Sequence, residues 1–415
     1  MLSDSSFKRT QSTSIAPHAW SAVGSMTLCV ALLIASEFMP VSLLTPIAAD
    51  LNATEGMAGQ AISISGLFAL VTSLFIANIA GRFDRRHLLM GLTTLMLVSL
   101  ALIATAPNFT VLMAARALLG VTIGGFWSLS TATIMRLVPE ESIPKALGVL
   151  FTGNAVATAF AAPLGSYLGD IIGWRGVFWA LTPIVLANLI WQWVSLPSMR
   201  PQQPIPVMRV LGLLKRRDVA LATVAQMFSY GGAFTIFTYL RPFLETKTHV
   251  SVPQLSLLLL SLGVAGFLGT YGASVLLRRH FDALLTGLPF ALGVVSLGLL
   301  AVNQSLAGVA LMMFLWGTFN SAIPVSWSAW LTRSLRNDPE AGGGLMVGAV
   351  QLSIMLGGVF GGVLLDRLSI NATFLSGIGL LALAGTTMVY AQRTSSPEDH
   401  KSRELECGES VAIEA

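Results

Sequence analysis

The chain has 415 residues, of which 54% are hydrophobic and only 11% are charged. A soluble domain carries about 25% charged residues, so this composition excludes a soluble protein and predicts an all-α membrane protein. The sequence holds two cysteines and no GxxxxGK[ST] run, which excludes a disulfide framework, a thiolate metal cluster and this kind of ATP-binding loop, so no cofactor or metal is expected.

Twelve apolar stretches follow one another along the chain. A membrane-spanning helix needs about 20 mostly apolar residues. The predicted spans cover approximately residues 20–44, 57–80, 88–106, 110–135, 143–168, 174–195, 219–240, 254–277, 284–302, 306–331, 343–365 and 371–391.

The basic residues predict the orientation of these spans. With both termini inside, most of the 24 Lys and Arg residues fall on the inner side. The exceptions are Arg175, Arg241, Lys247 and Arg367, which fall outside, and Arg116, which lies within a span. This bias predicts cytoplasmic termini. The net charge of +4 then indicates contact with anionic lipid and not with nucleic acid.

The second half of the sequence repeats features of the first. Gly165, Asp170 and Phe178 recur 196 residues later as Gly361, Asp366 and Phe374. We therefore expect two pseudo-symmetric six-helix halves, with a substrate site between them near the middle of the membrane. The predicted parts are an N-terminal tail, a first half, a cytoplasmic linker, a second half and a C-terminal tail, over residues 1–19, 20–196, 197–218, 219–392 and 393–415.

Glu37 is the only acidic residue inside a long apolar stretch. A carboxylate in the middle of a bilayer costs about 2.5–3.5 kcal/mol on insertion scales, and residues of this kind usually mark a substrate or proton pathway. We therefore predict that Glu37 carries a proton.

Two further charged sites each leave two interpretations open. Arg116 in the fourth span either braces carbonyl groups of a neighbouring helix or tunes the proton affinity of Glu37. In the loop between the second and third spans, Asp84 and Arg85 either only set the topology or form a gate in which Asp84 binds a basic residue or a helix end.

Aromatic and small polar side chains share helix faces in several spans. Arg116, Gly120, Gly124 and Trp127 lie on one face, and Asn320, Pro324, Trp327 and Ser328 lie on another. Such faces suit a flat, uncharged, hydroxylated ligand, although each Trp also fits core packing, and Asn154 and Gln351 also fit hydrogen bonds between helices. The candidate substrate-binding residues are Phe38, Trp127, Ser128, Asn154, Tyr230, Phe234, Thr238, Asn320, Trp327 and Gln351. The glycines Gly120 and Gly124, by contrast, predict close helix packing.

Short motifs resemble those of the major facilitator superfamily, and in particular its drug:proton antiporters. Arg116 with Gly120 and Gly124 is similar to the fourth-span motif associated with proton coupling. Asp84-Arg85-Arg86 is similar to the loop motif between spans two and three, and Ala162-Pro163-Leu164-Gly165 to the fifth-span antiporter motif. The resemblance implies gating roles for Asp84, Arg85, Pro163 and Gly165.

A closer resemblance covers nearly the whole chain. The runs 36–46, 124–128, 136–139, 162–166 and 237–242 are similar to those of bacterial purine ribonucleoside efflux pumps. The resemblance implies export of inosine, guanosine and adenosine across the inner membrane in exchange for protons, by a protein that works as a monomer. The sister sugar-efflux transporters share the Glu-Phe and Phe-Trp-Ser motifs, so these short motifs do not choose the substrate.

Three alternatives stay open at this point. One is export of sugars or amphipathic drugs, and a second is a non-transporting membrane sensor on the same fold. The third, an enzyme, has little support, because the sequence shows no nucleophile-plus-base constellation and the five His residues lie outside the spans.

Overall fold

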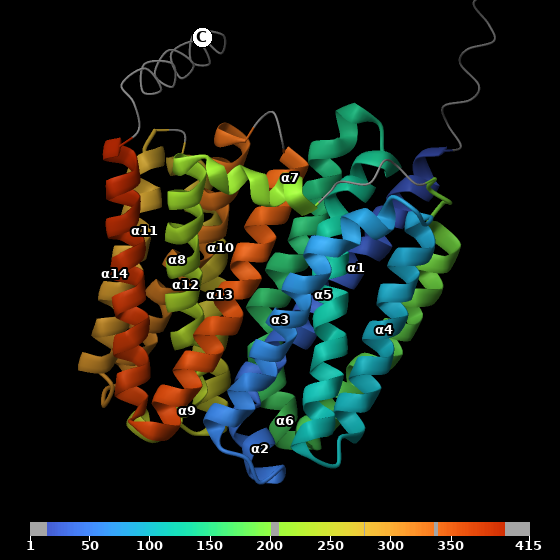
Figure 1. Cartoon of the computed structure of the whole chain (residues 1–415). Helices are drawn as coiled ribbons and strands as arrows, with labels where there is room; N and C mark the ends of the chain where they lie inside the picture. Colours follow the sequence, from blue (N-terminus) through green and yellow to red (C-terminus); the bar gives the residue numbers. More distant parts are fainter. Residues whose placement is uncertain (1–14, 201–206, 278, 336–338, 395–415) are drawn as a thin grey trace, which may run out of the picture.

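The computed structural model describes residues 15–200, 207–277, 279–335 and 339–394, and these residues form a bundle of long helices (Figure 1). Within the described residues, eleven helices are long and apolar enough to cross a membrane. In chain order they are α1 (Ile15–Ser42), α3 (Glu55–Ala80), α4 (Arg85–Thr105), α5 (Phe109–Leu137), α6 (Ile143–Ser195), α8 (Arg217–Thr238), α10 (Val252–Leu276), α11 (Phe281–Ala301), α12 (Leu306–Ser334), α13 (Pro339–Arg367) and α14 (Ile370–Thr394).

Helix α6 contains two of the predicted spans. It has 53 residues, and its backbone leaves the helical conformation at Gly173, where φ is 72° and ψ is 160°. Side chains disfavour this conformation, so glycine permits the chain to kink there. The kink separates the two stretches predicted at 143–168 and 174–195, and the fold is therefore the predicted twelve-span arrangement.

The first span of each half breaks in the same way. Helix α1 ends at Ser42 and continues as the short α2 (Leu44–Asp50), and α8 ends at Thr238 and continues as α9 (Leu240–Phe243) and η3 (Leu244–Thr248). Pro46 and Pro242 occupy the third position of these short helices, where a missing backbone N–H is tolerated. The remaining short elements are η1 (Glu140–Ser142), α7 (Val207–Gly212) and η2 (Leu213–Lys215).

The two halves are separate bundles that meet along two seams. In the first half α1 packs on α6, α3 on α5, and α4 on α5 and α6. In the second half α8 packs on α14, α10 on α12, and α11 on α12 and α14. Across the halves, α3 packs against α13 and α6 packs against α10. A functional site between the halves is therefore bounded by these two seams.

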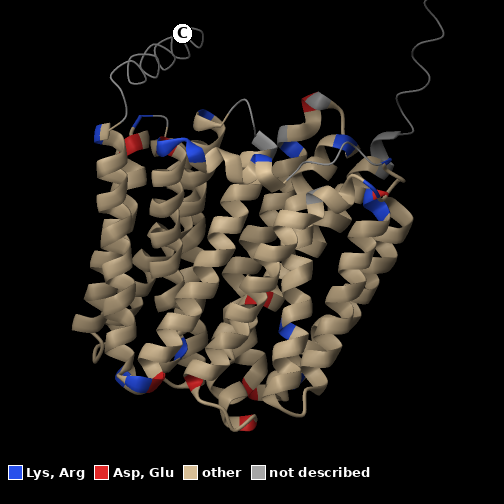
Figure 2. Cartoon of the chain, viewed as in Figure 1, with Lys and Arg blue, Asp and Glu red and all other residues tan. Residues whose placement is uncertain are grey.

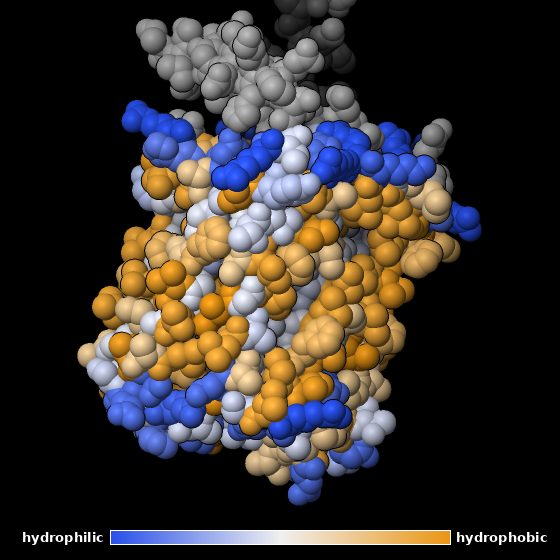
Figure 3. Space-filling view, turned by 60° about the vertical axis from the view of Figure 1, so that its left-hand side comes forward, coloured by the Kyte–Doolittle hydropathy of each residue, from blue (hydrophilic) through white to orange (hydrophobic). Residues whose placement is uncertain are grey.

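Charge and hydropathy divide the surface into layers. Lys and Arg gather mainly at the end of the bundle at which α1 begins and α14 ends, called here the terminal end (Figure 2). The opposite end, formed by α2 and α9, is called the distal end (Figure 1). Between the two polar ends runs a belt of apolar side chains (Figure 3). This pattern is the one expected of a protein that crosses a membrane.

Candidate functional site

Glu37 lies inside the bundle. It occupies the second half of α1, and only 5% of its surface is exposed. Within the described part of the chain, no group donates a hydrogen bond to its carboxylate, and its one charged neighbour is Arg116. A carboxylate buried away from water costs free energy unless it is paired or takes up a proton. This environment suits a group that gains and loses a proton.

Arg116 connects three helices of the first half. Its side chain is 1% exposed, its Nε donates to the Ala61 carbonyl of α3 at 2.9 Å, and its Nη1 donates to the Ser36 carbonyl of α1 at 2.9 Å. Its Nη2 lacks a hydrogen-bond partner. The guanidinium thus braces neighbouring carbonyl groups, as one of the two interpretations expects, and it still attracts the Glu37 carboxylate.

Two glycines bring α5 close enough to α3 for Arg116 to make these bonds. A Cβ atom on Gly120 would lie 2.3 Å from the Ser65 carbonyl oxygen, and one on Gly124 would lie 2.1 Å from that of Ala69. Real Cβ atoms do not approach so closely, so both positions require glycine. The packing role predicted for this glycine pair is confirmed.

An aromatic cluster crosses from one half to the other beside Glu37. Phe38 of α1 lies 6.1 Å from Phe234 and 5.7 Å from Phe237 of α8, measured between ring centroids. Phe237 in turn stacks on Trp316 of α12 at 5.9 Å. These four residues, called here the cross-half aromatic cluster, include two candidates, Phe38 and Phe234, and join α1 of the first half to α8 and α12 of the second.

The two predicted Trp platforms pack against aromatic rings of their own halves. Trp127 is half-buried and stacks on Phe151 at 6.2 Å, and both residues belong to the first half. Trp327 is 2% exposed and packs edge-on against Trp330 at 6.0 Å in the second half. Neither tryptophan belongs to the cross-half aromatic cluster.

The remaining polar candidates differ in whether their hydrogen bonds are satisfied. The Ser128 hydroxyl donates to the Gly124 carbonyl of its own helix at 2.7 Å. The Thr238 hydroxyl and the Gln351 Nε2 are buried and have no hydrogen-bond partner among the residues that the structure describes. Half-buried candidates are Asn154, Tyr230 and Asn320.

Asp84 caps the start of its own helix, α4. It accepts hydrogen bonds from the backbone N–H of Arg86 at 2.8 Å, from the N–H of Met199 at 3.0 Å, and from the Ser198 hydroxyl. Partial burial acts against ionisation, but these hydrogen bonds outweigh it and hold the pKa of Asp84 below its usual value. All of these contacts lie within the first half and the segment that follows it. Arg85, the next residue, is buried.

The fifth-span motif lies against α1. Pro163 is buried inside α6, and a Cβ atom on Gly165 would lie 2.7 Å from the Ser42 hydroxyl and 3.2 Å from Met39 Cγ. The motif therefore sets the approach of α6 to the part of α1 that follows Glu37.

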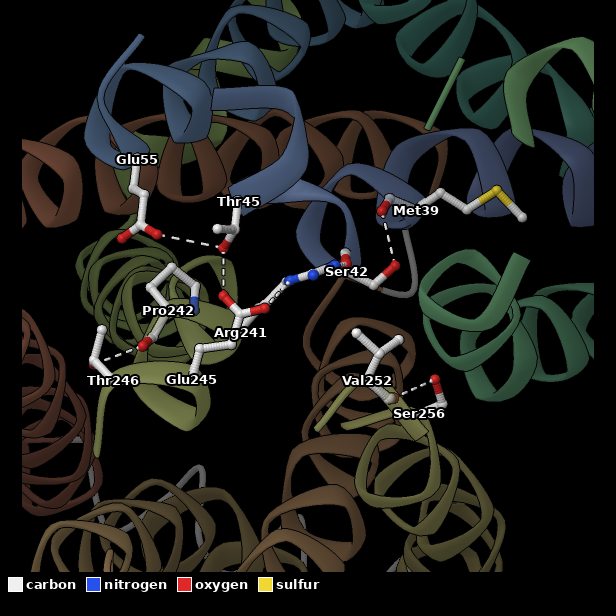
Figure 4. A network of polar contacts seen from close by, with 10 residues as sticks. All are labelled: Met39, Ser42, Thr45, Glu55, Arg241, Pro242, Glu245, Thr246, Val252 and Ser256. Atoms are coloured by element: carbon white, nitrogen blue, oxygen red, sulfur yellow. Dashed lines mark hydrogen bonds and ion pairs between the residues drawn. The ribbon is translucent and has the colours of Figure 1, made fainter. Parts of the chain in front are cut away.

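At the distal end, Arg241 and Glu245 of the second half bind Ser42 and Thr45 of the first half (Figure 4). Asp366 of α13 binds the first turn of α3. From the sequence, Arg241 was placed only by topology and helix face and Asp366 only by the repeat, and contacts between the halves were predicted for none of these residues. A usable signal existed, because Thr45 and Arg241 are separated by the repeat spacing of 196 residues.

Gln226 of α8 is a second omission from the predicted site. It is 3% exposed, and within the described part of the chain its Nε2 has no hydrogen-bond partner. It lies four and eight residues before Tyr230 and Phe234 and therefore shares their helix face. Residues four apart in a helix share a face, so this spacing from Tyr230 would have found Gln226 in the sequence.

Comparison with known proteins identifies the family. The family model described as Major Facilitator Superfamily matches residues 26–343. The chain belongs to this superfamily. Its fold is similar to the crystal structure of a bacterial homologue of the human lysosomal transporter Spinster, in an inward-facing and unoccupied conformation. The TM-score is 0.73 at 15% identity, over 92% of this chain and 99% of that one.

Two groups of relatives carry different names. A protein of Pseudomonas aeruginosa named transcription regulatory protein OpdE is 48% identical over 383 residues, which cover 91% of this chain and 95% of the relative. The purine ribonucleoside efflux pump NepI of Salmonella paratyphi B is 38% identical over 379 residues, with coverage of 91% and 95%. NepI of Salmonella enteritidis is 39% identical over 375 residues, with coverage of 90% and 93%.

Proposed function

We propose that this superfamily member exports purine ribonucleosides, of the inosine, guanosine and adenosine class, in exchange for protons. The observation that carries the proposal is the buried Glu37 carboxylate, which among the described residues has Arg116 as its one charged neighbour and directly precedes Phe38 of the cross-half aromatic cluster. The names of the NepI relatives support the substrate class.

Proton exchange would follow from the burial of Glu37. Uptake of a proton from outside removes the cost of the buried charge and allows the halves to rearrange with no substrate bound. Binding of a nucleoside between the halves then favours release of that proton to the cytoplasm. Each proton that enters down a potential of about 100 mV, negative inside, supplies about 2.3 kcal/mol, and a unit of pH gradient adds about 1.4 kcal/mol.

The nucleoside would bind among the aromatic and amide side chains between the halves. Phe38 and Phe234 offer rings that can stack on a flat purine. The unpartnered amide of Gln351 can pair with polar atoms at the purine edge or on the ribose. Trp127, Ser128, Asn154, Tyr230, Thr238, Asn320 and Trp327 stay as further candidates.

The proposed location is the bacterial inner membrane, with both termini in the cytoplasm. Lys and Arg concentrate at the terminal end (Figure 2), and cytoplasmic segments carry an excess of these residues. The distal end would then face the periplasm. We propose a monomer, because one chain supplies both halves.

Transport in inside-out membrane vesicles tests this function. With an acidic lumen, labelled inosine is expected to accumulate inside the vesicles, and dissipation of the pH gradient should stop it. Unlabelled guanosine or adenosine should compete, whereas sugars and bulky lipophilic cations should not. Accumulation of sugars or cations in place of inosine would instead assign the protein to sugar or drug export.

A non-transporting regulator is the second candidate, because the relative at 48% identity is named a transcription regulatory protein. This alternative predicts no accumulation of any of these solutes in the same vesicles. It also predicts that Glu37→Gln leaves ligand binding and signalling intact.

A further inference from the structure

The two halves are joined at the distal end by a chain of polar contacts around Arg241 (Figure 4). Arg241 Nε donates to Glu245 Oε1 at 2.8 Å, and Arg241 Nη1 donates to the Ser42 carbonyl. Glu245 Oε2 accepts a hydrogen bond from the Thr45 hydroxyl at 2.7 Å. The Arg241 side chain is 8% exposed and that of Glu245 is 25% exposed, so water competes little for the guanidinium. The Arg241–Glu245 ion pair of the second half therefore binds the first half at Ser42 and at Thr45.

These contacts use groups that the end of α1 leaves available. Ser42 is the last residue of α1, and the last carbonyl groups of a helix have no partner within it. These carbonyl groups carry the negative end of the helix dipole, which attracts a cation such as Arg241. The Arg241–Ser42 contact exists because the short break after α1 exposes this end to α9.

A second set of contacts joins α13 to the start of α3. The Asp366 carboxylate accepts from the Thr54 hydroxyl at 2.6 Å and from the Gly56 N–H at 3.1 Å. It thus lies at the positive end of the α3 dipole. A Cβ atom on Gly56 would lie 2.4 Å from Asp366 Oδ2, so glycine is required for this approach. Beside it, the buried Tyr239 hydroxyl donates to the Gly358 carbonyl at 2.7 Å.

The repeat places an equivalent carboxylate, Asp170 or Asp366, in each half. Asp366 binds the other half, and Asp170 differs from it. Asp170 of α6 is the counterpart of Asp366, since 196 residues separate them. Asp170 is exposed, and within the described ranges it takes part in no hydrogen bond or ion pair to the second half. The seam between α6 and α10 is instead close-packed, because a Cβ atom on Gly263 would lie 2.2 Å from the Ala159 carbonyl oxygen.

We propose that two contact sets form a latch that holds the distal end closed: Arg241 and Glu245 on Ser42 and Thr45, and Asp366 on Thr54 and Gly56. Both sets fix a charged side chain of the second half to a helix end or hydroxyl of the first half, so the distal end cannot open until they break. Loss of either set therefore shifts the population toward a distally open state. This proposal rests on the proposed transport function, in which the two ends of the protein open alternately. It does not depend on which substrate is transported.

Distances between spin labels test the latch without substrate. Thr105 and Gln304 are exposed at the distal ends of the first and second halves, and cysteines there can carry labels in a Cys29→Ser/Cys407→Ser chain. The variants are Asp366→Ala and Glu245→Gln, and Asp170→Ala is the matched control. We expect both latch variants to raise the ratio of a longer-distance population to the parental one by about tenfold or more, which corresponds to 1.4 kcal/mol.

The control decides whether the effect belongs to the latch. Asp170→Ala should leave the distance distribution of the parent unchanged. A parental distribution in both Asp366→Ala and Glu245→Gln would overturn the latch, and so would an equal shift in Asp170→Ala. Because no nucleoside is added, failure of the nucleoside proposal would leave this result unaffected.

Discussion

Replacement of Gly124 by alanine is expected to destabilise the protein strongly. The added Cβ atom would lie 2.1 Å from the carbonyl oxygen of Ala69, so α5 and α3 must separate because neither backbone can turn away. Overpacking of this kind typically costs about 1–3 kcal/mol, and a clash with backbone belongs at the upper end of that range. The separation would also draw Arg116 away from the Ala61 carbonyl. Thermal unfolding of the purified variant in detergent measures the loss.

Gly91→Ala is the matched control for this prediction. Gly91 also lies within a membrane-spanning helix, α4, but a Cβ atom there meets no other atom within 4 Å. Alanine in the middle of a helix is favoured over glycine by about 0.5–1 kcal/mol, so this variant should be as stable as the parent or slightly more stable. Equal stability of Gly124→Ala and Gly91→Ala would show that the close approach of α5 to α3 is wrong.

Arg116→Leu is expected to abolish proton-coupled transport and to lower stability, because it removes two hydrogen bonds between helices and the charge that Glu37 faces. A hydrogen bond to a charged group contributes about 1.5–3 kcal/mol, and the Ala61 and Ser36 carbonyl groups each lose one. Part of that loss should return in the double variant Arg116→Leu/Glu37→Gln, in which no buried anion is left. Residues of one network show coupling energies of about 0.5–3 kcal/mol.

A double-mutant cycle on thermal stability measures this coupling. Arg116→Lys serves as the comparison. Lysine keeps the positive charge, but it lacks the planar guanidinium whose N–H groups donate to two carbonyl groups at once. If the effects of Arg116→Leu and Glu37→Gln simply add, the two side chains do not interact, and Arg116 has only the bracing role.

Features that depend on local composition could be predicted from the sequence. The twelve spans follow from runs of apolar residues, and even the kink in α6 falls at Gly173, between two predicted spans. Burial of Glu37 and Arg116 follows from charged residues within such runs. The close packing at Gly120 and Gly124 follows from glycine spacing, because only glycine admits a backbone so near.

Features that depend on contacts across the halves could not be predicted from local sequence patterns. Thr45 and Glu245 meet although 200 residues separate them, and no local pattern marks either as the partner of the other. The two Trp platforms were selected by helix spacing, which defines a face but not which neighbour covers it. Trp327 is thus only 2% exposed and packs against Trp330 of its own half. Phe38, which helix spacing did not select, packs against Phe234 of the second half.

Proton movement in liposomes tests the central claim most directly. Purified protein would be reconstituted around an internal pH dye, inosine would be added outside, and parallel samples would carry Glu37→Gln. The account predicts an inosine-dependent change of internal pH in the parent and none in the variant. An equal pH change in Glu37→Gln would contradict the role of Glu37, and no change in the parent would contradict nucleoside–proton exchange itself.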